Sequence, residues 1–188
     1  MPRICIVNIS GNIGSGKSTL IEHCQLTTGT YFHKWDAILK YPEPIEDWNF
    51  DLKAYYDAME TGECDKIIPA AVALQKTIHD SYSDMYSKIR KRIFQLSSLQ
   101  RDVLVLIERG PHDAARIFIP TIMERWPFTD EHNKNQLLDI QRRCLELDRF
   151  LKSDICRFEN GVSLMNRIVS WQVRLLTDVD VCIERSNK

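Results

Sequence analysis

One short stretch near the start of the chain limits more than any other what the chain can fold into. Residues Gly11-Asn-Ile-Gly-Ser-Gly-Lys-Ser18 fit the pattern G-x-x-x-x-G-K-[ST] without deviation. Glycines let backbone amides turn inward on phosphate groups, and a helix that follows the loop adds the positive end of its dipole. The stretch therefore predicts a strand, a phosphate-binding loop (P-loop) and a helix in that order.

The spacing of the P-loop also assigns roles to its side chains. Lys17 is expected to reach the β- and γ-phosphates of a nucleoside triphosphate, and the Ser18 hydroxyl is expected to bind Mg²⁺. We therefore expect ATP and Mg²⁺ as cofactors. The nucleotide-binding residues predicted in this way are Gly11, Asn12, Ile13, Gly14, Ser15, Gly16, Lys17, Ser18 and Thr19.

Short aliphatic runs alternate with longer helical patterns along the chain, which indicates an α/β domain with a parallel sheet and right-handed crossovers. We expect a single domain over residues 1–188. The segment from Tyr41 to Ile45 is expected to be extended, because each of its prolines disfavours a helical predecessor. Strands are predicted at Arg3–Ile9, Thr30–His33, Val103–Ile107 and Val179–Ile183, and helices at 17–26, at 48–99 with breaks near Gly62 and Pro69, at 135–150 and at 164–176.

Composition excludes several kinds of partner. The net charge of -1 over 188 residues argues against nucleic acid, whose binding domains are usually basic. No stretch approaches the ~18 apolar residues that a membrane span needs. The six cysteines are scattered without metal-site spacing, which is typical of free thiols in a reducing compartment, so a cytoplasmic location is expected.

A phosphate-transfer site also needs an acidic residue near the metal, usually after a neighbouring hydrophobic strand. The aliphatic run Val103–Ile107 is followed directly by Glu108 and Arg109. Open α/β sheets bind ligands at the carboxyl ends of their strands, where both side chains would lie. Glu108 is therefore predicted to bind Mg²⁺ together with Ser18, and Arg109 to hold the transferred phosphoryl group. The alternative is a surface Glu–Arg pair that ends a strand.

Five features follow one another along the chain: Gly11–Thr19, Glu43-Pro44, Trp48, Glu108 and Arg109. In this order they resemble the deoxyribonucleoside kinase family, which includes the thymidine kinases of herpesviruses and the cellular deoxycytidine and deoxyguanosine kinases. The resemblance implies a three-layer P-loop kinase fold, with a parallel sheet flanked by helices. It implies transfer of the ATP γ-phosphoryl group to the 5′-hydroxyl of a deoxynucleoside, most similar to thymidine, in nucleotide salvage. It also implies a homodimer.

The resemblance also implies residue roles. Glu43 resembles the carboxylate that accepts the proton of the 5′-hydroxyl, and Lys17 and Arg109 complete the catalytic set. Trp48 resembles the aromatic wall of the nucleoside pocket, and Gln75 resembles the amide that pairs with the base edge. Tyr56 resembles the tyrosine that binds the 3′-hydroxyl, although Tyr55 competes for this role. Taken alone, Trp48 could be plain core packing, and Gln75 could be an ordinary exposed helix residue.

The chain departs from the family in two places. Gly110 replaces the usual serine after Arg109, and in the altered pattern that follows either Asp113 or Arg116 is expected to contact the substrate, whereas His112 is interpreted as a plain loop histidine. The chain ends at Lys188, shortly after the predicted strand Val179–Ile183. We therefore expect it to be truncated before the arginine-rich lid and the last strand that the family has.

Two other functions remain open from the sequence. A nucleoside monophosphate kinase, such as a thymidylate kinase, would share the P-loop but would need an arginine for the acceptor phosphate in place of Glu43. A lid-less relative could bind nucleotide or nucleoside without turnover. The long stretch between Gln75 and Val103 is closer to the viral thymidine kinases, for which the host cytoplasm or nucleus is the expected location.

Overall fold

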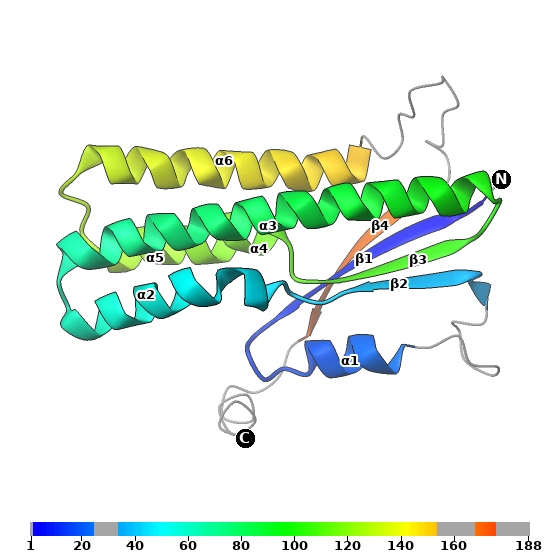
Figure 1. Ribbon diagram of the computed structural model, residues 1–188, viewed down its shortest axis with the longest axis horizontal. Coiled ribbons are helices and arrows are strands. Elements are labelled where there is room, and N and C mark those ends of the chain that lie inside the picture. The colour runs from blue at the N-terminus through cyan, green and yellow to red at the C-terminus, as the bar shows by residue number, and fades with distance from the viewer. Residues whose placement is uncertain (1, 25–33, 154–167, 176–188) are drawn as a thin grey trace. The chain divides into compact units, whose positions relative to one another are not determined.

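The computed structural model describes residues 2–24, 34–153 and 168–175 (Figure 1). The chain divides into two compact units, each assembled from separate segments. The unit called here the sheet unit combines Met1–Glu43, Ser87–Gly110 and Leu151–Lys188. The unit called the helical unit combines Pro44–Tyr86 and Pro111–Phe150.

Four parallel strands form the sheet of the sheet unit. They are β1 (Ile4–Gly11), β2 (Ala37–Tyr41), β3 (Val103–Glu108) and β4 (Ile168–Leu175), in the spatial order β2-β3-β1-β4. Val103 lies opposite Ile4 of β1 and Ala37 of β2, and Ile4 also lies opposite Ile168 of β4. Because the strands are parallel and in this register, their carboxyl ends meet at one edge. The prediction of an α/β fold with a parallel sheet flanked by helices is confirmed.

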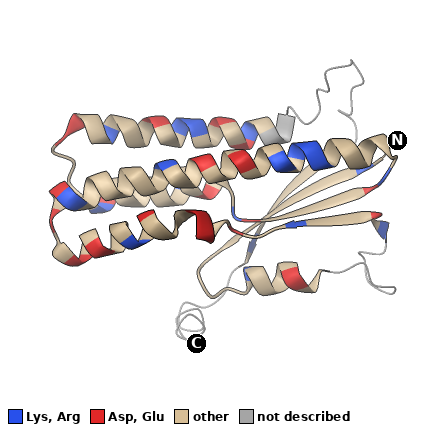
Figure 2. Cartoon of the chain, viewed as in Figure 1, with Lys and Arg blue, Asp and Glu red and all other residues tan. Residues whose placement is uncertain are grey.

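Helices lie on both sides of this sheet (Figure 1). The short helix α1 (Lys17–His23) packs on one face through an apolar cluster of Ile9, Ile21, Cys24, Leu104 and Leu106. The C-terminal part of the long helix α3 (Cys64–Ser98) lies on the other side, where its Ile89 and Ile93 are fully buried. All six residues of β3 are buried, as an aliphatic run between two helical layers requires. The strands accordingly carry few charges, whereas charges of both signs cover the helices (Figure 2).

The structure confirms the strands predicted at Arg3–Ile9 and Val103–Ile107, while those predicted at Thr30–His33 and Val179–Ile183 lie outside the described residues. The helix predicted at Leu164–Leu176 is wrong where the structure describes it, because Ile168–Leu175 is strand β4. In this segment Val169, Trp171 and Val173 alternate with polar residues, which is the period-two pattern of a strand. Its β-branched and aromatic residues also favour an extended backbone over a helix.

The helical unit begins with a single 3-10 turn, η2 (Ile45–Trp48), so the extended stretch predicted from Tyr41 ends earlier than expected. Helix α2 (Asn49–Thr61) ends at Gly62, whose φ of 70° caps it and confirms the predicted break. The break predicted at Pro69 is wrong, because α3 continues through it. Pro69 is exposed, and buried Ile67, Ile68 and Ala71 around it hold the helix against its neighbours. Tertiary packing here outweighs the local cost of proline.

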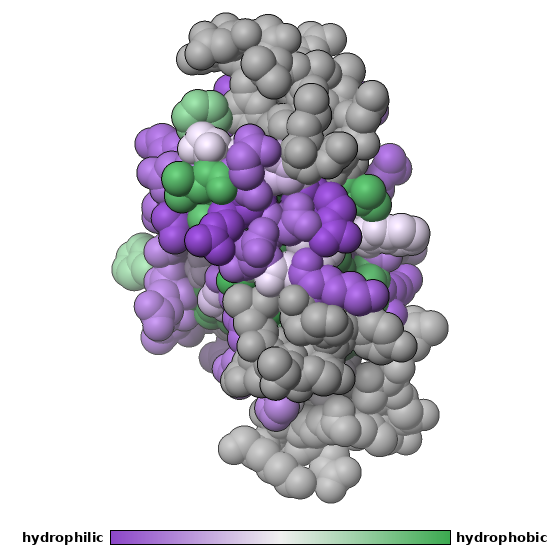
Figure 3. Space-filling model, turned by 90° about the vertical axis from the view of Figure 1, so that its right-hand side faces the viewer, coloured by the Kyte–Doolittle hydropathy of each residue, from purple (hydrophilic) through white to green (hydrophobic). Residues whose placement is uncertain are grey.

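The remaining helices of this unit follow Gly110. A continuous helical stretch comprises α4 (Pro111–Asp113), the π-helical turn η3 (Ala114–Phe118) and α5 (Ile119–Arg125). Helix α6 (Glu131–Ser153) contains the helix predicted at 135–150. Of the helices in the described ranges, none is both long and apolar enough to cross a membrane. Hydrophilic residues also predominate on the described part of the face in Figure 3, with hydrophobic residues scattered among them.

Candidate functional site

The P-loop connects β1 to α1 at the carboxyl edge of the sheet. Gly14 (φ 74°) and Gly16 (φ 89°) adopt left-handed backbone conformations, which glycine reaches without a steric penalty. The Lys17 side chain is buried and its Nζ donates to the carbonyl of Asn12 at 2.8 Å. The predicted phosphate lysine is thus folded back over the loop that would hold the phosphates.

Gly11 is the residue at which β1 ends and the loop begins. A Cβ placed there would lie 2.7 Å from Ser15 Oγ and 2.8 Å from the Leu175 carbonyl oxygen of β4. Both distances are below van der Waals contact, and the second involves backbone. Only glycine therefore fits where β1, the P-loop and the end of β4 meet.

The predicted metal ligands are adjacent. Ser18 Oγ, from the start of α1, donates to Glu108 Oε1 at 2.8 Å, and Glu108 is buried at the carboxyl end of β3. In the ranges that the structure describes, no cluster of three or more His, Cys, Asp or Glu side chains could hold a metal ion. The oxygen pair nevertheless fits Mg²⁺, which is usually bound through one or two protein groups with phosphates and waters completing the octahedron.

Arg109 links Glu43 to the P-loop. Its Nη1 donates to both carboxylate oxygens of Glu43, at 2.8 and 2.9 Å, and its Nη2 donates to the Gly11 carbonyl at 3.3 Å. Its backbone has a φ of 55°, an uncommon value for a residue with a side chain, and its N–H donates to the Ile9 carbonyl at 2.9 Å. Backbone strain of this kind clusters at functional sites. The structure thus brings together four residues predicted from the sequence, Ser18, Glu43, Glu108 and Arg109.

The environment of Glu43 opposes its ionisation. Its side chain is only 6% exposed. Burial raises the pKa of the Glu43 carboxyl above its ordinary value of 4.5, although the charge and the hydrogen bond of Arg109 act in the opposite direction. The nearby Glu108 adds to the increase and Lys17 reduces it. A carboxylate with a raised pKa is a stronger base than an exposed glutamate.

The residues predicted to bind the nucleoside belong to the helical unit. Trp48 is buried, its Nε1 donates to Ser81 Oγ at 2.9 Å, and its ring centroid lies 5.9 Å from that of Tyr82. Gln75 is 3% exposed, and its Oε1 accepts no hydrogen bond among the described residues. A buried amide oxygen without a partner is costly and indicates a ligand or water at that position. The alternative interpretation of Gln75 as an ordinary exposed helix residue is wrong, because its side chain is buried.

The other predicted contacts differ in their exposure. Tyr56 on α2 is 52% exposed, and the competing Tyr55 is less exposed, being half-buried. Asp113 is buried at the end of α4, while Arg116 in the π-helical turn is exposed. His112 is half-buried and lies in helix α4, so its interpretation as a loop histidine is wrong. Burial thus favours Asp113 over Arg116 as the residue that faces the interior of the unit.

Sequence reasoning missed Ser81, which holds the indole of Trp48. Its Oγ accepts from Trp48 Nε1 and donates to the Ile78 carbonyl at 2.9 Å. The sequence carries only a general indication of such a partner, because a buried tryptophan usually needs an acceptor for its N–H. Which of the many hydroxyls of α3 supplies it depends on how α2 and α3 pack, and periodicity does not give that.

Comparisons with known proteins add no relative. No protein-family model matches the chain, and no curated protein sequence matches it. The resemblance to the deoxyribonucleoside kinases therefore rests on the motifs of this chain alone.

Proposed function

We propose that the chain is a deoxynucleoside kinase that transfers the γ-phosphoryl group of ATP to the 5′-hydroxyl of a thymidine-like deoxynucleoside in nucleotide salvage. In this proposal its sheet and helices form a three-layer P-loop kinase fold. The observation that carries the proposal is the pairing of Glu43 with Arg109 at the sheet edge where the P-loop begins. An acceptor carboxylate, an arginine and a phosphate-binding loop are the parts that such a transfer needs.

The sheet unit supplies the phosphate-binding half of the proposed reaction. The loop amides and Lys17 would hold the β- and γ-phosphates, and Ser18 with Glu108 would hold Mg²⁺. Magnesium would neutralise charge that develops on the phosphate oxygens. Arg109, next to Glu108, would stabilise the transferred group. Phosphoryl transfer passes through a loose transition state, so this positioning and charge neutralisation contribute most of the rate.

Glu43 favours a hydroxyl acceptor over a phosphate acceptor. As a carboxylate it would accept the proton of the 5′-hydroxyl and orient the attacking oxygen. The same negative charge would repel the phosphate of a nucleoside monophosphate. Arg109 keeps this carboxylate in one orientation, since both of its oxygens accept from the same guanidinium. A nucleoside is therefore the better supported acceptor.

Gln75 and Trp48 support a nucleobase as the recognised group. An amide offers both a donor and an acceptor to a Watson–Crick edge, and Gln75 Oε1 has no protein partner among the described residues. Trp48 offers an aromatic face whose orientation Ser81 and Tyr82 restrict. The residues fit a planar base with polar edges.

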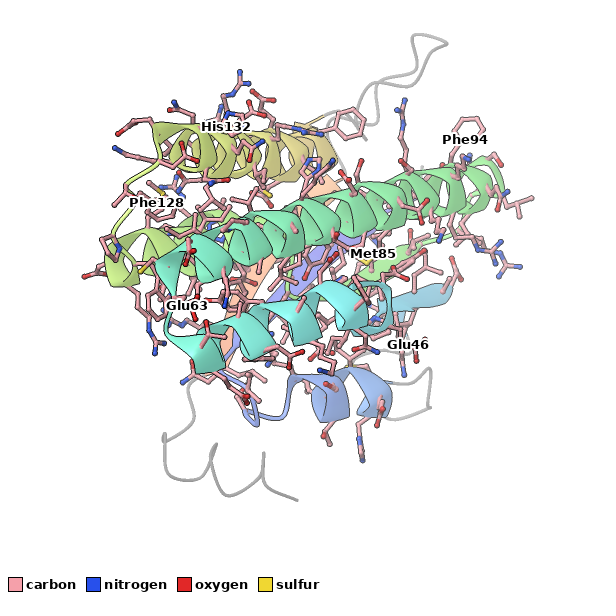
Figure 4. All side chains as sticks on the ribbon, turned by 60° about the vertical axis from the view of Figure 1, so that its left-hand side comes forward. Glu46, Glu63, Met85, Phe94, Phe128 and His132 are labelled. Atoms are coloured by element: carbon pink, nitrogen blue, oxygen red, sulfur yellow. The ribbon has the colours of Figure 1, made fainter. Side chains whose placement is uncertain are left out.

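A turnover assay with ATP, Mg²⁺ and each of the four common deoxynucleosides tests the proposal. We expect phosphorylation, with thymidine preferred, and a loss of kcat/KM of about 10²–10⁴-fold in Lys17→Ala and Glu43→Gln. One matched control is Lys53→Ala, whose side chain is exposed on α2. The other is Glu46→Gln, whose side chain is exposed at η2 (Figure 4). Both controls should retain the wild-type rate.

Other outcomes of the assay would decide for another function. Preference for thymidine monophosphate over thymidine would establish a nucleoside monophosphate kinase. Saturable binding of ATP or thymidine without any product would establish a relative that has lost catalysis. Turnover that survives in Lys17→Ala and Glu43→Gln would contradict the proposed site.

A further inference from the structure

The helical stretch Pro111–Arg125 contains an irregular turn immediately before Ile119. Residues Ala114–Phe118 form a π-helix, in which the N–H of Ile119 donates to the carbonyl of Ala114, five residues earlier. In an ordinary α-helix that donor would bond the carbonyl four residues earlier, which belongs to Ala115. The π register therefore leaves the Ala115 carbonyl to the next donor along the chain, at residue 120.

Residue 120 cannot supply that donor, because it is Pro120 and has no backbone N–H. Ala115 is fully buried, so its carbonyl cannot rely on bulk water. Instead Gln141 of α6 donates from its Nε2 to the Ala115 carbonyl at 2.7 Å. A side chain from another helix thus replaces the missing N–H of the proline. Without it, a buried carbonyl would lose its partner.

The π turn affects the residue that precedes it. One extra residue in a turn rotates everything before it by about 100° around the helix axis relative to the residues after it. Asp113 is the last residue before the turn and is 4% exposed. Burial and the carboxylates of Asp148 and Asp113 raise the pKa of Tyr86 on α3, which agrees with Asp113 facing the interior of the helical unit.

We infer that Gln141 is a positioning residue: by replacing the missing N–H of Pro120 it holds the π turn, and the turn aims Asp113 at the nucleoside. The inference rests on the proposed function, because the nucleoside is the ligand that Asp113 would contact. Gln141 itself touches no reacting group. π turns often occur at functional sites, where they redirect a side chain without ending the helix.

A thermal-unfolding cycle without ligand tests the structural half. Gln141→Leu should lower Tm, whereas Gln136→Leu, an exposed glutamine on the same helix, should not. Pro120→Ala gives residue 120 an N–H, so the Ala115 carbonyl has a backbone donor in either helical register. Gln141→Leu should then lower Tm much less in the Pro120→Ala background. Equal losses in both backgrounds would overturn the inference.

Steady-state kinetics with thymidine and ATP test the functional half. Gln141→Leu should raise KM for thymidine about tenfold or more, by analogy with other residues that orient a binding group, and should leave KM for ATP unchanged. Gln136→Leu should change neither value. A lower Tm with an unchanged KM for thymidine would show that Gln141 is merely structural and would overturn the inference.

Together, the unfolding and the kinetic experiments distinguish a failure of this inference from a failure of the proposed function. If the wild-type chain neither binds nor phosphorylates a deoxynucleoside, the proposed function fails and the positioning role fails with it, whatever the unfolding cycle shows. If the wild-type chain phosphorylates thymidine and Gln141→Leu behaves like Gln136→Leu, only the positioning role fails.

Discussion

At the scale of single residues, the pairing of Glu43 with Arg109 is the most informative feature of the sheet unit. Glutamate buried to this extent is costly unless it is paired and hydrogen-bonded. Arg109 provides both, and it does so from a backbone conformation that few residues with side chains adopt. Both side chains are held at the P-loop by contacts between residues that are far apart in the sequence, since Arg109 bonds Glu43 and Gly11.

The raised pKa of Glu43 predicts how the proposed activity depends on pH. The reaction needs the ionised carboxylate, so kcat/KM should fall as pH decreases through the pKa of Glu43. Because burial raises this pKa above 4.5, the fall should begin at a higher pH than an exposed glutamate would give. A profile of kcat/KM against pH for thymidine measures it. A profile that stays flat down to pH 4.5 would contradict the assigned role.

At the scale of helices and strands, local sequence patterns predict an element correctly where its tertiary packing favours the same structure as the pattern does. The aliphatic strands β1 and β3 and the glycine that ends α2 were predicted, because burial on both faces and a left-handed cap have local signatures. The helix predicted over β4 was wrong, because the alternation of Val169, Trp171 and Val173 with polar residues is a local pattern of a strand, and this strand pairs with β1. Strand β2 was missed, because the extended backbone was predicted only from the prolines, over Tyr41–Ile45, whereas β2 ends at Tyr41.

The residues of the candidate site likewise fall into two groups, those that a local sequence pattern predicts and those that it does not. The P-loop, Glu108 and Arg109 have a fixed spacing or follow a recognisable strand, so their positions could be predicted from the sequence. Ser81 and Gln141 could not, because each acts on a residue of another helix. Their roles depend on which helices pack together, and a single sequence does not show that.

Pro69 gives a prediction at this scale. It lies on an exposed face within the continuous helix α3, where it removes a backbone hydrogen bond and gains little packing. Pro69→Ala should therefore increase the free energy of unfolding by about 1–3 kcal/mol, measured by urea denaturation. Pro127→Ala is the control, because Pro127 is exposed in the connection after α5, and it should give no increase. A decrease for Pro69→Ala would show that the proline ring stabilises the helix.

At the scale of the whole molecule, the residues predicted to act are divided between the two compact units. The sheet unit contains the P-loop, Glu43, Glu108 and Arg109, and the helical unit contains Trp48, Gln75 and Asp113. Each unit is built from separate chain segments, so neither corresponds to one continuous stretch of sequence. Binding of nucleotide to the sheet unit can be measured on the intact chain without an acceptor.

Nucleotide binding should stabilise the folded chain through mass action. At about 100 times its Kd, MgATP should increase the free energy of unfolding by about 2.7 kcal/mol, and Tm should rise accordingly. Lys17→Ala should abolish most of this increase, because Lys17 is the predicted phosphate contact, while Lys53→Ala should preserve it. Differential scanning fluorimetry across a range of MgATP concentrations measures both. An equal increase in Lys17→Ala would place the nucleotide elsewhere.

We propose that Glu43 and the P-loop together transfer a phosphoryl group to a nucleoside hydroxyl. The most direct measurement of this transfer follows γ-phosphate-labelled ATP incubated with Mg²⁺, thymidine and the intact chain, with products identified by mass spectrometry. We expect the label in thymidine 5′-monophosphate with the wild-type chain and its near absence with Glu43→Gln. Label that appears only in inorganic phosphate, or that reaches thymidine equally well with Glu43→Gln, would contradict this role of Glu43 and the P-loop.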